Sequence, residues 1–265
     1  MNGILIAILV LAAMGAVFGL LLAIAARAFH VEVDERQEQI QEVLPGANCG
    51  GCGYAGCANY AAAVVKGEAT NLCAAGGDPV ACQVAAIMGV EAQAAEKSVA
   101  FVRCFGTTGQ VAQRFIYSGI SDCMAAARLG GGGGPSGCKD GCLGMGSCVA
   151  ACPFDAIHVE NGVAKVDAAA CVGCMKCADA CPKKLIVRVP ASADAAVRCA
   201  SQEKGKTVRR TCEAGCIGCT LCSRACPTGA ITVTGNLASV NTEACVGCML
   251  CVETCPRDII RDLLA

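Results

Sequence analysis

The pattern of apolar and polar residues changes along this chain. The 24 residues from Gly3 to Ala26 are uncharged and apolar, long enough at 1.5 Å per residue for a helix that crosses a hydrocarbon core of about 30 Å. A cleaved signal peptide is the alternative, but no basic residue precedes the run, which is also longer than the apolar part of a usual signal. We therefore expect a single transmembrane helix over residues 1–27.

Shorter patterned segments follow this run. Residues 31–44 are polar and rich in Glu and Gln, which predicts a helical stalk. Residues 157–166 alternate around Asn-Gly and residues 232–240 around Gly-Asn, which predicts two β-hairpins. Together these segments indicate an α+β fold.

Cysteine is unusually frequent, with 25 in 265 residues. Three perfect copies of one spacing occur, in which three cysteines, each two residues from the next, precede a Cys-Pro pair. The copies are Cys171-x2-Cys174-x2-Cys177-x3-Cys181-Pro182, Cys216-x2-Cys219-x2-Cys222-x3-Cys226-Pro227 and Cys245-x2-Cys248-x2-Cys251-x3-Cys255-Pro256. This spacing is typical of two-cluster bacterial ferredoxins, in which three thiolates hold one 4Fe-4S cluster and the fourth binds the neighbouring cluster.

An internal repeat of 74 residues reveals a fourth, altered copy of this motif. The shift places Cys148 on Cys222 but places Met145 on Cys219, and a thioether cannot become a thiolate ligand. We therefore expect Cys138 to supply the missing ligand. The repeat predicts two tandem ferredoxin-like modules with two clusters each.

Each module is expected to exchange one ligand between its two clusters. The predicted sets are Cys138, Cys142, Cys148 with Cys181; Cys171, Cys174, Cys177 with Cys152; Cys216, Cys219, Cys222 with Cys255; and Cys245, Cys248, Cys251 with Cys226. A fifth cluster is predicted at Cys49-x2-Cys52-x4-Cys57-x15-Cys73, where glycines between the cysteines let the backbone wrap a cluster. Zinc is the alternative occupant of this last block.

Five cysteines lie outside these sets. Cys82 is expected to be a small buried residue of a helix. Cys104, Cys123, Cys199 and Cys212 are enough for a sixth cluster, and ordinary buried thiols are the alternative. Disulfides and structural zinc fit the whole pattern less well, because the cysteine count is odd and zinc sites favour paired CxxC units.

The distribution of charge predicts a topology. Arg27 and Arg36 follow the apolar run and no basic residue precedes it, so we expect the N-terminus outside the cell and the rest in the cytoplasm. Iron-sulfur thiols also need a reducing compartment. The predicted location is the inner (cytoplasmic) membrane, with a single pass and the cluster domains inside.

Other classes of function have little support. Net charge is only −1 and aromatic residues make up 3% of the chain, so nothing favours nucleic-acid binding. The run Gly130 to Gly134 is typical of a flexible linker, not of a phosphate-binding loop. His30 and His158 have no partner that suggests acid-base chemistry, and no catalytic site for NAD is present. The chemistry that the sequence predicts is electron transfer.

The expected division of the chain follows from these segments. The predicted boundaries are 1–27 for the transmembrane helix, 28–46 for the stalk, 47–100 for the N-terminal 4Fe-4S domain, 101–137 for a connector with the glycine-rich linker, 138–190 for the first module, 191–211 for a second connector and 212–265 for the second module.

The chain closely resembles the B subunit family of the Rnf complex, the ferredoxin:NAD oxidoreductase that pumps ions across bacterial membranes. The resemblance rests on the apolar N-terminal run, the Cys49 to Cys57 block, the segments 44–49, 141–149 and 152–157, and the ferredoxin array. The second pair of clusters makes it similar to the longer form found in acetogens and clostridia.

The resemblance implies a role and partners. The chain would accept electrons from soluble ferredoxin and pass them to other Rnf subunits in a membrane hetero-oligomer, with Na+ or H+ as the pumped ion. Ferredoxins are generally acidic, so a docking surface is expected where basic residues gather. These are Lys183, Lys184, Arg188, Arg198, Lys204, Lys206, Arg209 and Arg210. Alternatives are a polyferredoxin subunit of a hydrogenase and a structural metal-binding membrane adaptor without redox function.

Overall fold

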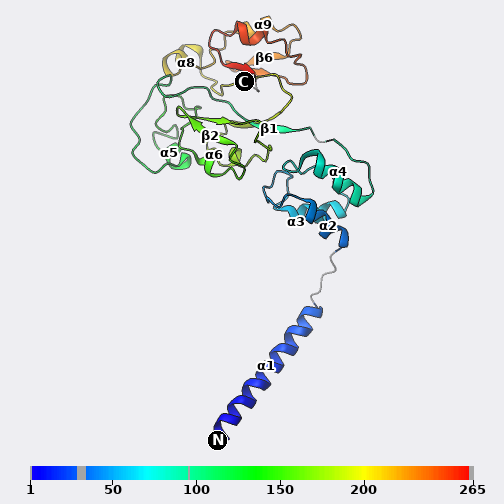
Figure 1. Cartoon of the computed structure of the whole chain (residues 1–265). Helices are drawn as coiled ribbons and strands as arrows, with labels where there is room; N and C mark the ends of the chain where they lie inside the picture. The colour runs from blue at the N-terminus through cyan, green and yellow to red at the C-terminus, as the bar shows by residue number, and fades with distance from the viewer. Residues whose placement is uncertain (1, 29–33, 95, 263–265) are drawn as a thin grey trace.

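The computed structural model describes residues 2–28, 34–94 and 96–262 (Figure 1). From the N-terminus, the chain forms an isolated helix, a small helical domain and two similar modules of short strands and short helices. His30, named above as isolated, lies outside the described residues.

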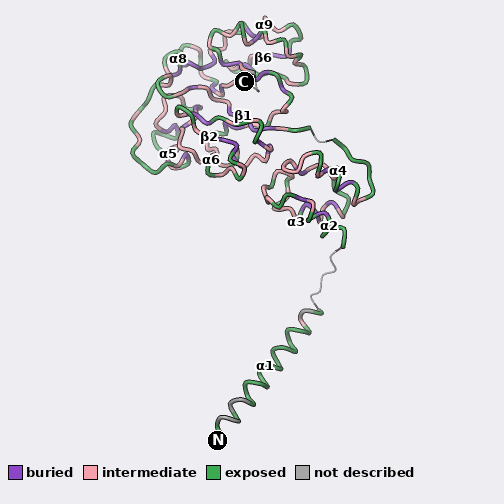
Figure 2. The backbone as a smooth tube through the Cα atoms, in the orientation of Figure 1, coloured by how far each residue is buried: buried purple, intermediate pink, exposed green. Residues whose placement is uncertain are grey.

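Helix α1 (Asn2–Ala28) contains the whole apolar run, which is rich in the strong helix formers alanine and leucine. Where its burial is described, the helix is mostly exposed (Figure 2), and Phe18 and Leu22 are among its exposed large apolar residues. Among the described residues, however, no helix reaches the combination of length and apolar character that a membrane crossing requires. The predicted transmembrane helix is therefore wrong: apolar side chains favour a helix, but helix formation alone does not make a span.

The helical domain contains α2 (Glu35–Val43), α3 (Cys57–Val65) and α4 (Gly77–Met88). The predicted stalk corresponds to α2, and the structure places this helix within the domain, because Ile40 is fully buried against Tyr60, Val64 and Val84. The Tyr60 hydroxyl donates a hydrogen bond to the carbonyl of Ala69 at 2.9 Å. These contacts give the N-terminal cysteine block a core of its own.

Two modules of matching architecture follow. The first contains β1 (Ser98–Val102), α5 (Cys123–Arg128), α6 (Ser147–Ala150), β2 (Ile157–Glu160), β3 (Val163–Val166), α7 (Lys176–Asp179) and β4 (Ile186–Pro190). The second contains β5 (Ala195–Val197), α8 (Gly205–Thr211), α9 (Leu221–Ala225), β6 (Ile231–Thr234), β7 (Leu237–Val240), α10 (Leu250–Thr254) and β8 (Ile260–Asp262). The strands β6 and β7 repeat β2 and β3 after 74 residues.

The strands form two-stranded antiparallel sheets. The pairs β2 with β3 and β6 with β7 are the two predicted hairpins, which are confirmed. The sequence did not indicate the other two pairs. In each of them, the first strand of a module pairs with its last strand. Strand β1 pairs with β4 and strand β5 pairs with β8, with Val102 opposite Ile186 and Val197 opposite Ile260.

The cores of the modules are small and contain the cysteines. In the first, Val99 and Val102 of β1 pack with Cys148, Cys171 and Cys177. The core of the second module is built in the same way, with Val197 of β5 beside Cys216, Cys222 and Cys251. The predicted domain boundary at residue 100 falls inside β1, which pairs with β4 of the first module.

Candidate iron-sulfur centres

The loops that carry the cysteine triplets share one backbone conformation. Each holds two residues at positive φ, one after the first cysteine and one after the second. The pairs are Gly144 with Gly146, Gly173 with Met175, Gly218 with Thr220, and Gly247 with Met249. Non-glycine residues avoid this region, so Met175, Thr220 and Met249 show that the loops are held in shape by the fold. The altered copy around Met145 has the same loop as the perfect ones.

Backbone N–H groups donate to several of the sulfur atoms. Ala100 of β1 donates to Cys171 Sγ at 3.3 Å, and Ala156 donates to Cys152 Sγ at 3.4 Å. Gly173 approaches Cys171 Sγ at 3.5 Å. Hydrogen bonds to sulfur are one of the ways in which proteins set the potential of iron-sulfur centres.

The four cysteines of the N-terminal block lie close together. Burial raises the pKa of Cys73, and the neighbouring thiols of Cys57, Cys52 and Cys49 raise it further. The side chain of Asn48 accepts a hydrogen bond from the backbone N–H of Cys57 at 2.9 Å and so fixes the loop to the start of α3.

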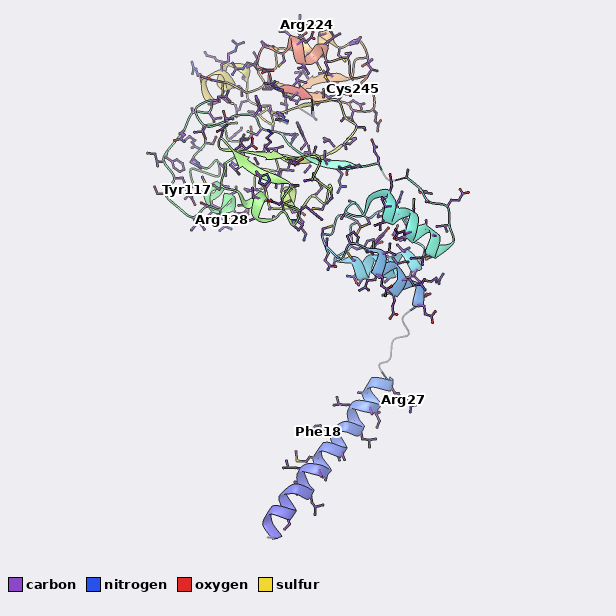
Figure 3. All side chains as sticks on the ribbon, in the orientation of Figure 1. Phe18, Arg27, Tyr117, Arg128, Arg224 and Cys245 are labelled. Atoms are coloured by element: carbon purple, nitrogen blue, oxygen red, sulfur yellow. The ribbon has the colours of Figure 1, made fainter. Side chains whose placement is uncertain are left out.

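The second module brings together its first predicted set and three cysteines of its second. The four cysteines of the first set line one cavity: Cys216, Cys219, Cys222 and Cys255. Burial raises the pKa of Cys222 to about 11, and the other three thiols add to the effect. In the other set, Cys245 and Cys248 are neighbours of Cys251, and Cys226 packs against the same core. Cys248 is exposed, and Cys245, three residues before it, lies near the surface of the second module (Figure 3).

In the first module, one set has the predicted members. Burial raises the pKa of Cys177 to about 12, and the neighbouring thiols of Cys171, Cys174 and Cys152 contribute to the shift. Burial raises the pKa of Cys174, and the thiol of Cys49 in the N-terminal block also contributes to this rise. The two parts of the chain are in contact here, because a Cβ atom on Gly51 would lie 3.1 Å from the Cα atom of Cys174.

The other set of the first module differs from the prediction. One cavity is lined by Cys142, Cys148 and Cys181 together with Cys123, and Cys138 is absent from it. Burial raises the pKa of Cys148 to about 11, with Cys142, Cys123 and Cys181 as its thiol neighbours. Cys123 thus takes the place that the sequence prediction assigned to Cys138.

Helix α5 explains this exchange. Its first residue, Cys123, donates its backbone N–H to the Ser147 hydroxyl at 2.7 Å, and that hydroxyl donates to the Asp122 carboxylate at 3.0 Å. Ser147 begins α6, directly after the altered loop, so these bonds hold Cys123 over Met145. The repeat contains no counterpart of α5, and its register therefore gave no signal for Cys123.

The remaining predicted residues have plain structural positions. Cys82, expected to be buried, is exposed, because α4 turns Ala81, Val84 and Ala85 inward and leaves this position outside. His158 is half exposed, with Nδ1 3.9 Å from the Asp155 carboxylate. Lys183 donates to the carbonyls of Gly132, Gly133 and Lys139, and so ties the glycine-rich segment to the module.

Two of the cysteine sets line cavities with four thiols each, and four thiolates are what a 4Fe-4S cluster requires. Within the described residues, no group of three or more His, Cys, Asp or Glu side chains is placed to hold a single metal ion.

Repeated loops of this shape, closed by a remote Cys-Pro, define a multi-cluster ferredoxin-type electron-transfer protein. Family models agree: one described as a putative Fe-S cluster matches residues 44–74, and three described as 4Fe-4S dicluster domains match residues 136–182, 170–230 and 212–261.

Curated relatives identify the family. The chain is 46% identical to the B subunit of the Na(+)-translocating ferredoxin:NAD(+) oxidoreductase complex of Acetobacterium woodii, over 91% of this chain and 72% of the relative. It is 42% identical to the B subunit of the proton-translocating complex of Clostridium ljungdahlii, over 91% and 85%. It is 41% identical to the B subunit of the ion-translocating oxidoreductase complex of Methanosarcina acetivorans, over 89% of each.

The chain belongs to the B subunit family of the ion-translocating ferredoxin:NAD+ oxidoreductase, the Rnf complex. The predicted resemblance is confirmed. The chain is an iron-sulfur electron-transfer subunit of this translocating oxidoreductase, it carries 4Fe-4S clusters, and its partners are other Rnf subunits.

Proposed function

We propose that this chain carries electrons from reduced soluble ferredoxin to other subunits of the Rnf complex. The observation that carries the proposal is that successive cysteine sets adjoin one another: Gly51 of the N-terminal block lies against Cys174, and Cys148 and Cys177 share one core. The names of the relatives from Acetobacterium woodii and Clostridium ljungdahlii, both ferredoxin:NAD(+) oxidoreductases, support ferredoxin as the electron donor.

We propose five ligand sets, supported by the positions of the cysteines. They are Cys49, Cys52, Cys57 and Cys73; Cys152, Cys171, Cys174 and Cys177; Cys123, Cys142, Cys148 and Cys181; Cys216, Cys219, Cys222 and Cys255; and Cys226, Cys245, Cys248 and Cys251. Each cluster, when bound, takes up and releases one electron. The protein contributes the loops, the hydrogen bonds to sulfur and the exclusion of water from the thiols.

We further propose that the chain works at the cytoplasmic face of the cell membrane, held there by the other subunits. The relatives are named as subunits of ion-translocating complexes, and thiols that ligate iron-sulfur clusters need the reducing conditions of the cytoplasm.

A direct test mixes the anaerobically purified chain with reduced ferredoxin and follows the loss of visible absorbance in stopped flow. The reduced chain is then offered to Rnf complex that lacks its own B subunit. We expect fast reduction by ferredoxin and restored ferredoxin-dependent NAD reduction. Cys82→Ala, at the exposed position outside all ligand sets, is the matched control and should behave like the parent. If ferredoxin cannot reduce the chain although dithionite does, the proposed donor is wrong.

A further inference from the structure

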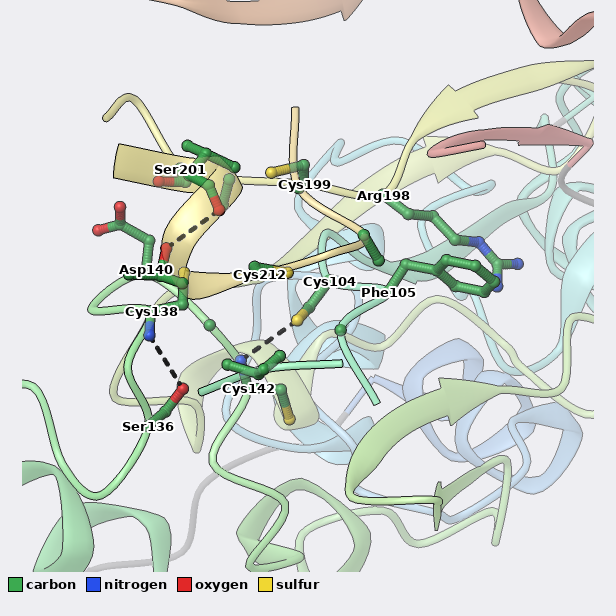
Figure 4. A pocket seen from close by; sticks show the side chains of 18 of the residues that line it. Cys104, Phe105, Ser136, Cys138, Asp140, Cys142, Arg198, Cys199, Ser201 and Cys212 are labelled. Atoms are coloured by element: carbon green, nitrogen blue, oxygen red, sulfur yellow. Dashed lines mark hydrogen bonds between the residues drawn. The ribbon is translucent and has the colours of Figure 1, made fainter. Parts of the chain in front are cut away.

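Four cysteines that belong to none of these five sets surround a cavity between the two modules. This cavity is lined by residues of both modules, among them Cys104, Cys138, Cys199 and Cys212. In Figure 4 the sulfur atoms of these four residues surround one space, while Cys142 turns its sulfur to the other side. The cavity is similar in size to the two that hold the sets of Cys222 and Cys148.

We propose that Cys104, Cys138, Cys199 and Cys212 ligate a sixth iron-sulfur cluster, which connects the two modules. The sequence had offered Cys123 as the fourth member of such a set. In the structure, Cys123 lies with the set of Cys148, and Cys138 lies in the cavity between the modules. Each of the two sets therefore has four thiols. The proposal rests on the function proposed above only for the passage of electrons, not for the binding of iron.

Each module contributes an equivalent pair of thiols, and this equivalence is the strongest support. Cys104 lies two residues after β1 and Cys199 lies two residues after β5, the strands that complete the two modules. Cys104 Sγ accepts the backbone N–H of Cys142 at 3.4 Å, and Cys199 Sγ accepts that of Cys216 at 3.3 Å.

The second pair is equivalent as well. Cys138 and Cys212 are related by the 74-residue repeat, and each lies four residues before the first cysteine of its ferredoxin motif, Cys142 or Cys216. The site therefore has an approximate twofold arrangement of two thiols from each module. Two modules that each bring half of a four-thiol site form a complete ligand set only when they pack together.

The electrostatic surroundings agree with this grouping. Burial raises the pKa of Cys138 to about 11, and its thiol neighbours are Cys212 and Cys199. Burial also raises the pKa of Cys104 to about 12, with Cys138 among its neighbours. The guanidinium of Arg257 donates to the carbonyl of Cys212 at 2.7 Å, and its positive charge favours the thiolate there.

The position of the site gives it a role. Through the N–H of Cys142 it touches the set of the first module, and through the N–H of Cys216 it touches the set of the second. No other cavity described above joins these two sets. A one-electron carrier at this point would accept an electron from one module and release it to the other, with no further reactant.

The test uses Cys199→Ala, because Cys199 lies outside every ferredoxin motif. The parent should contain about 24 iron atoms per chain, since each of six clusters holds four. The variant should lose about four irons, or convert one cluster to a three-iron form visible by electron paramagnetic resonance, with the other five clusters intact. Cys138→Ala should cause the same loss, and the double variant no more than either single variant. Cys82→Ala is the control.

Other outcomes would overturn the proposal. These are an unchanged iron and sulfide content in Cys199→Ala, or additive losses in the double variant with Cys138→Ala. Cys199→Ser, which keeps a ligand of similar size, guards against misfolding: it should retain the cluster with a shifted reduction potential. None of these readouts depends on ferredoxin, so failure of the proposed donor would be seen separately, in the stopped-flow reduction.

Discussion

Met145 and Cys123 show how one side chain can replace another while a loop keeps its shape. The loop of Met145 has the two positive-φ residues of its cysteine-bearing counterparts, although it lacks their central thiol. Met145 packs beside Cys123 in a small apolar cluster with Ala126 and Leu143. The backbone of the loop is therefore the same, while the ligand comes from a different element.

We expect Cys123→Ala to remove one cluster and Met145→Ala to remove none. The reason is that only the thiol of Cys123 lines the cavity with Cys142, Cys148 and Cys181. Iron and sulfide analysis of anaerobically purified protein checks both variants, with a loss of about four irons expected for the first. A Cys123→Ala protein with the full iron content would refute this ligand assignment.

Tyr60 is a second residue with a decisive role, in the helical domain. Its side chain is 1% exposed, and its hydroxyl donates to the Ala69 carbonyl and accepts the N–H of Leu72 at 3.1 Å. Both partners belong to the segment that leads to Cys73. One hydroxyl thus anchors the long connection between the third and fourth cysteines of the N-terminal block.

Tyr60→Phe should lower the free energy of unfolding of this domain by about 1–3 kcal/mol, because two part-buried hydrogen bonds of the hydroxyl are lost. Tyr54→Phe is the matched control. The Tyr54 hydroxyl bonds the exposed carboxylate of Glu68 at 2.7 Å, so its loss should cost about 1 kcal/mol or less. Denaturant unfolding followed by circular dichroism measures both; equal effects would contradict the anchoring role.

At the scale of elements, strands β1 and β5 precede the cysteine motifs in the sequence and pack against the modules that contain them. Strand β1 pairs with β4, and its Ala100 N–H bonds Cys171 Sγ. Its first residue also meets the cluster loop, since a Cβ atom on Gly173 would lie 2.3 Å from the Ser98 carbonyl oxygen. The strand and the loop can approach this closely only because position 173 is glycine.

Gly173→Ala should therefore destabilise the first module and lower the occupancy of its Cys171 set. Gly229→Ala separates the two causes, because Gly229 has nearly the same φ, 67°, but nothing within 4 Å of an added Cβ. The control should cost about 1–2 kcal/mol for backbone strain alone, and Gly173→Ala clearly more. Thermal unfolding and iron content are the measurements. Equal losses would show that contact with β1 is unimportant.

Across the whole molecule, three of the eight basic residues of the sequence prediction bind groups of the fold, Lys184 is exposed, and the other four are exposed at α8. Lys183 is bound to backbone carbonyls, Arg188 donates to the Ser98 hydroxyl at 3.0 Å, and Arg198 lies over the ring of Phe105. The exposed group at α8 consists of Lys204, Lys206, Arg209 and Arg210. Helix α8 also contributes Val208 and Thr211 to the cavity between the modules. Positive charge at α8 therefore lies next to the proposed sixth site.

We predict that acidic ferredoxin docks at α8. Reversing Lys204, Lys206, Arg209 and Arg210 to Glu should slow reduction by ferredoxin at low salt, and the difference should shrink as salt rises, because exposed charges are screened beyond about 8 Å at physiological salt. Reduction by a small uncharged donor should not change.

The control for this experiment reverses Lys66 and Arg128, which are exposed and remote from α8 in the sequence. Stopped-flow rates at several salt concentrations distinguish the two proteins. If the α8 variant is reduced as fast as the parent at low salt, ferredoxin docks elsewhere, most simply at the exposed end around Cys248.

Local spacing alone determined much of this protein. The triplets, the hairpins and the 74-residue repeat were all predictable, because each depends on residues a few positions apart and on turn chemistry that few side chains satisfy. The family likewise followed from these motifs. In contrast, the apolar N-terminal run indicated a membrane span that the described helices do not provide.

Only the tertiary structure decided which distant residues meet. It places Cys123 over Met145 and Cys138 between the modules, adds β1 and β5 to sheets far along the chain, and turns Cys82 outward. The physical reason is common to these cases. A thiol or a strand edge can bond any partner with suitable geometry, and the packing of whole elements, not the order of residues, selects that partner.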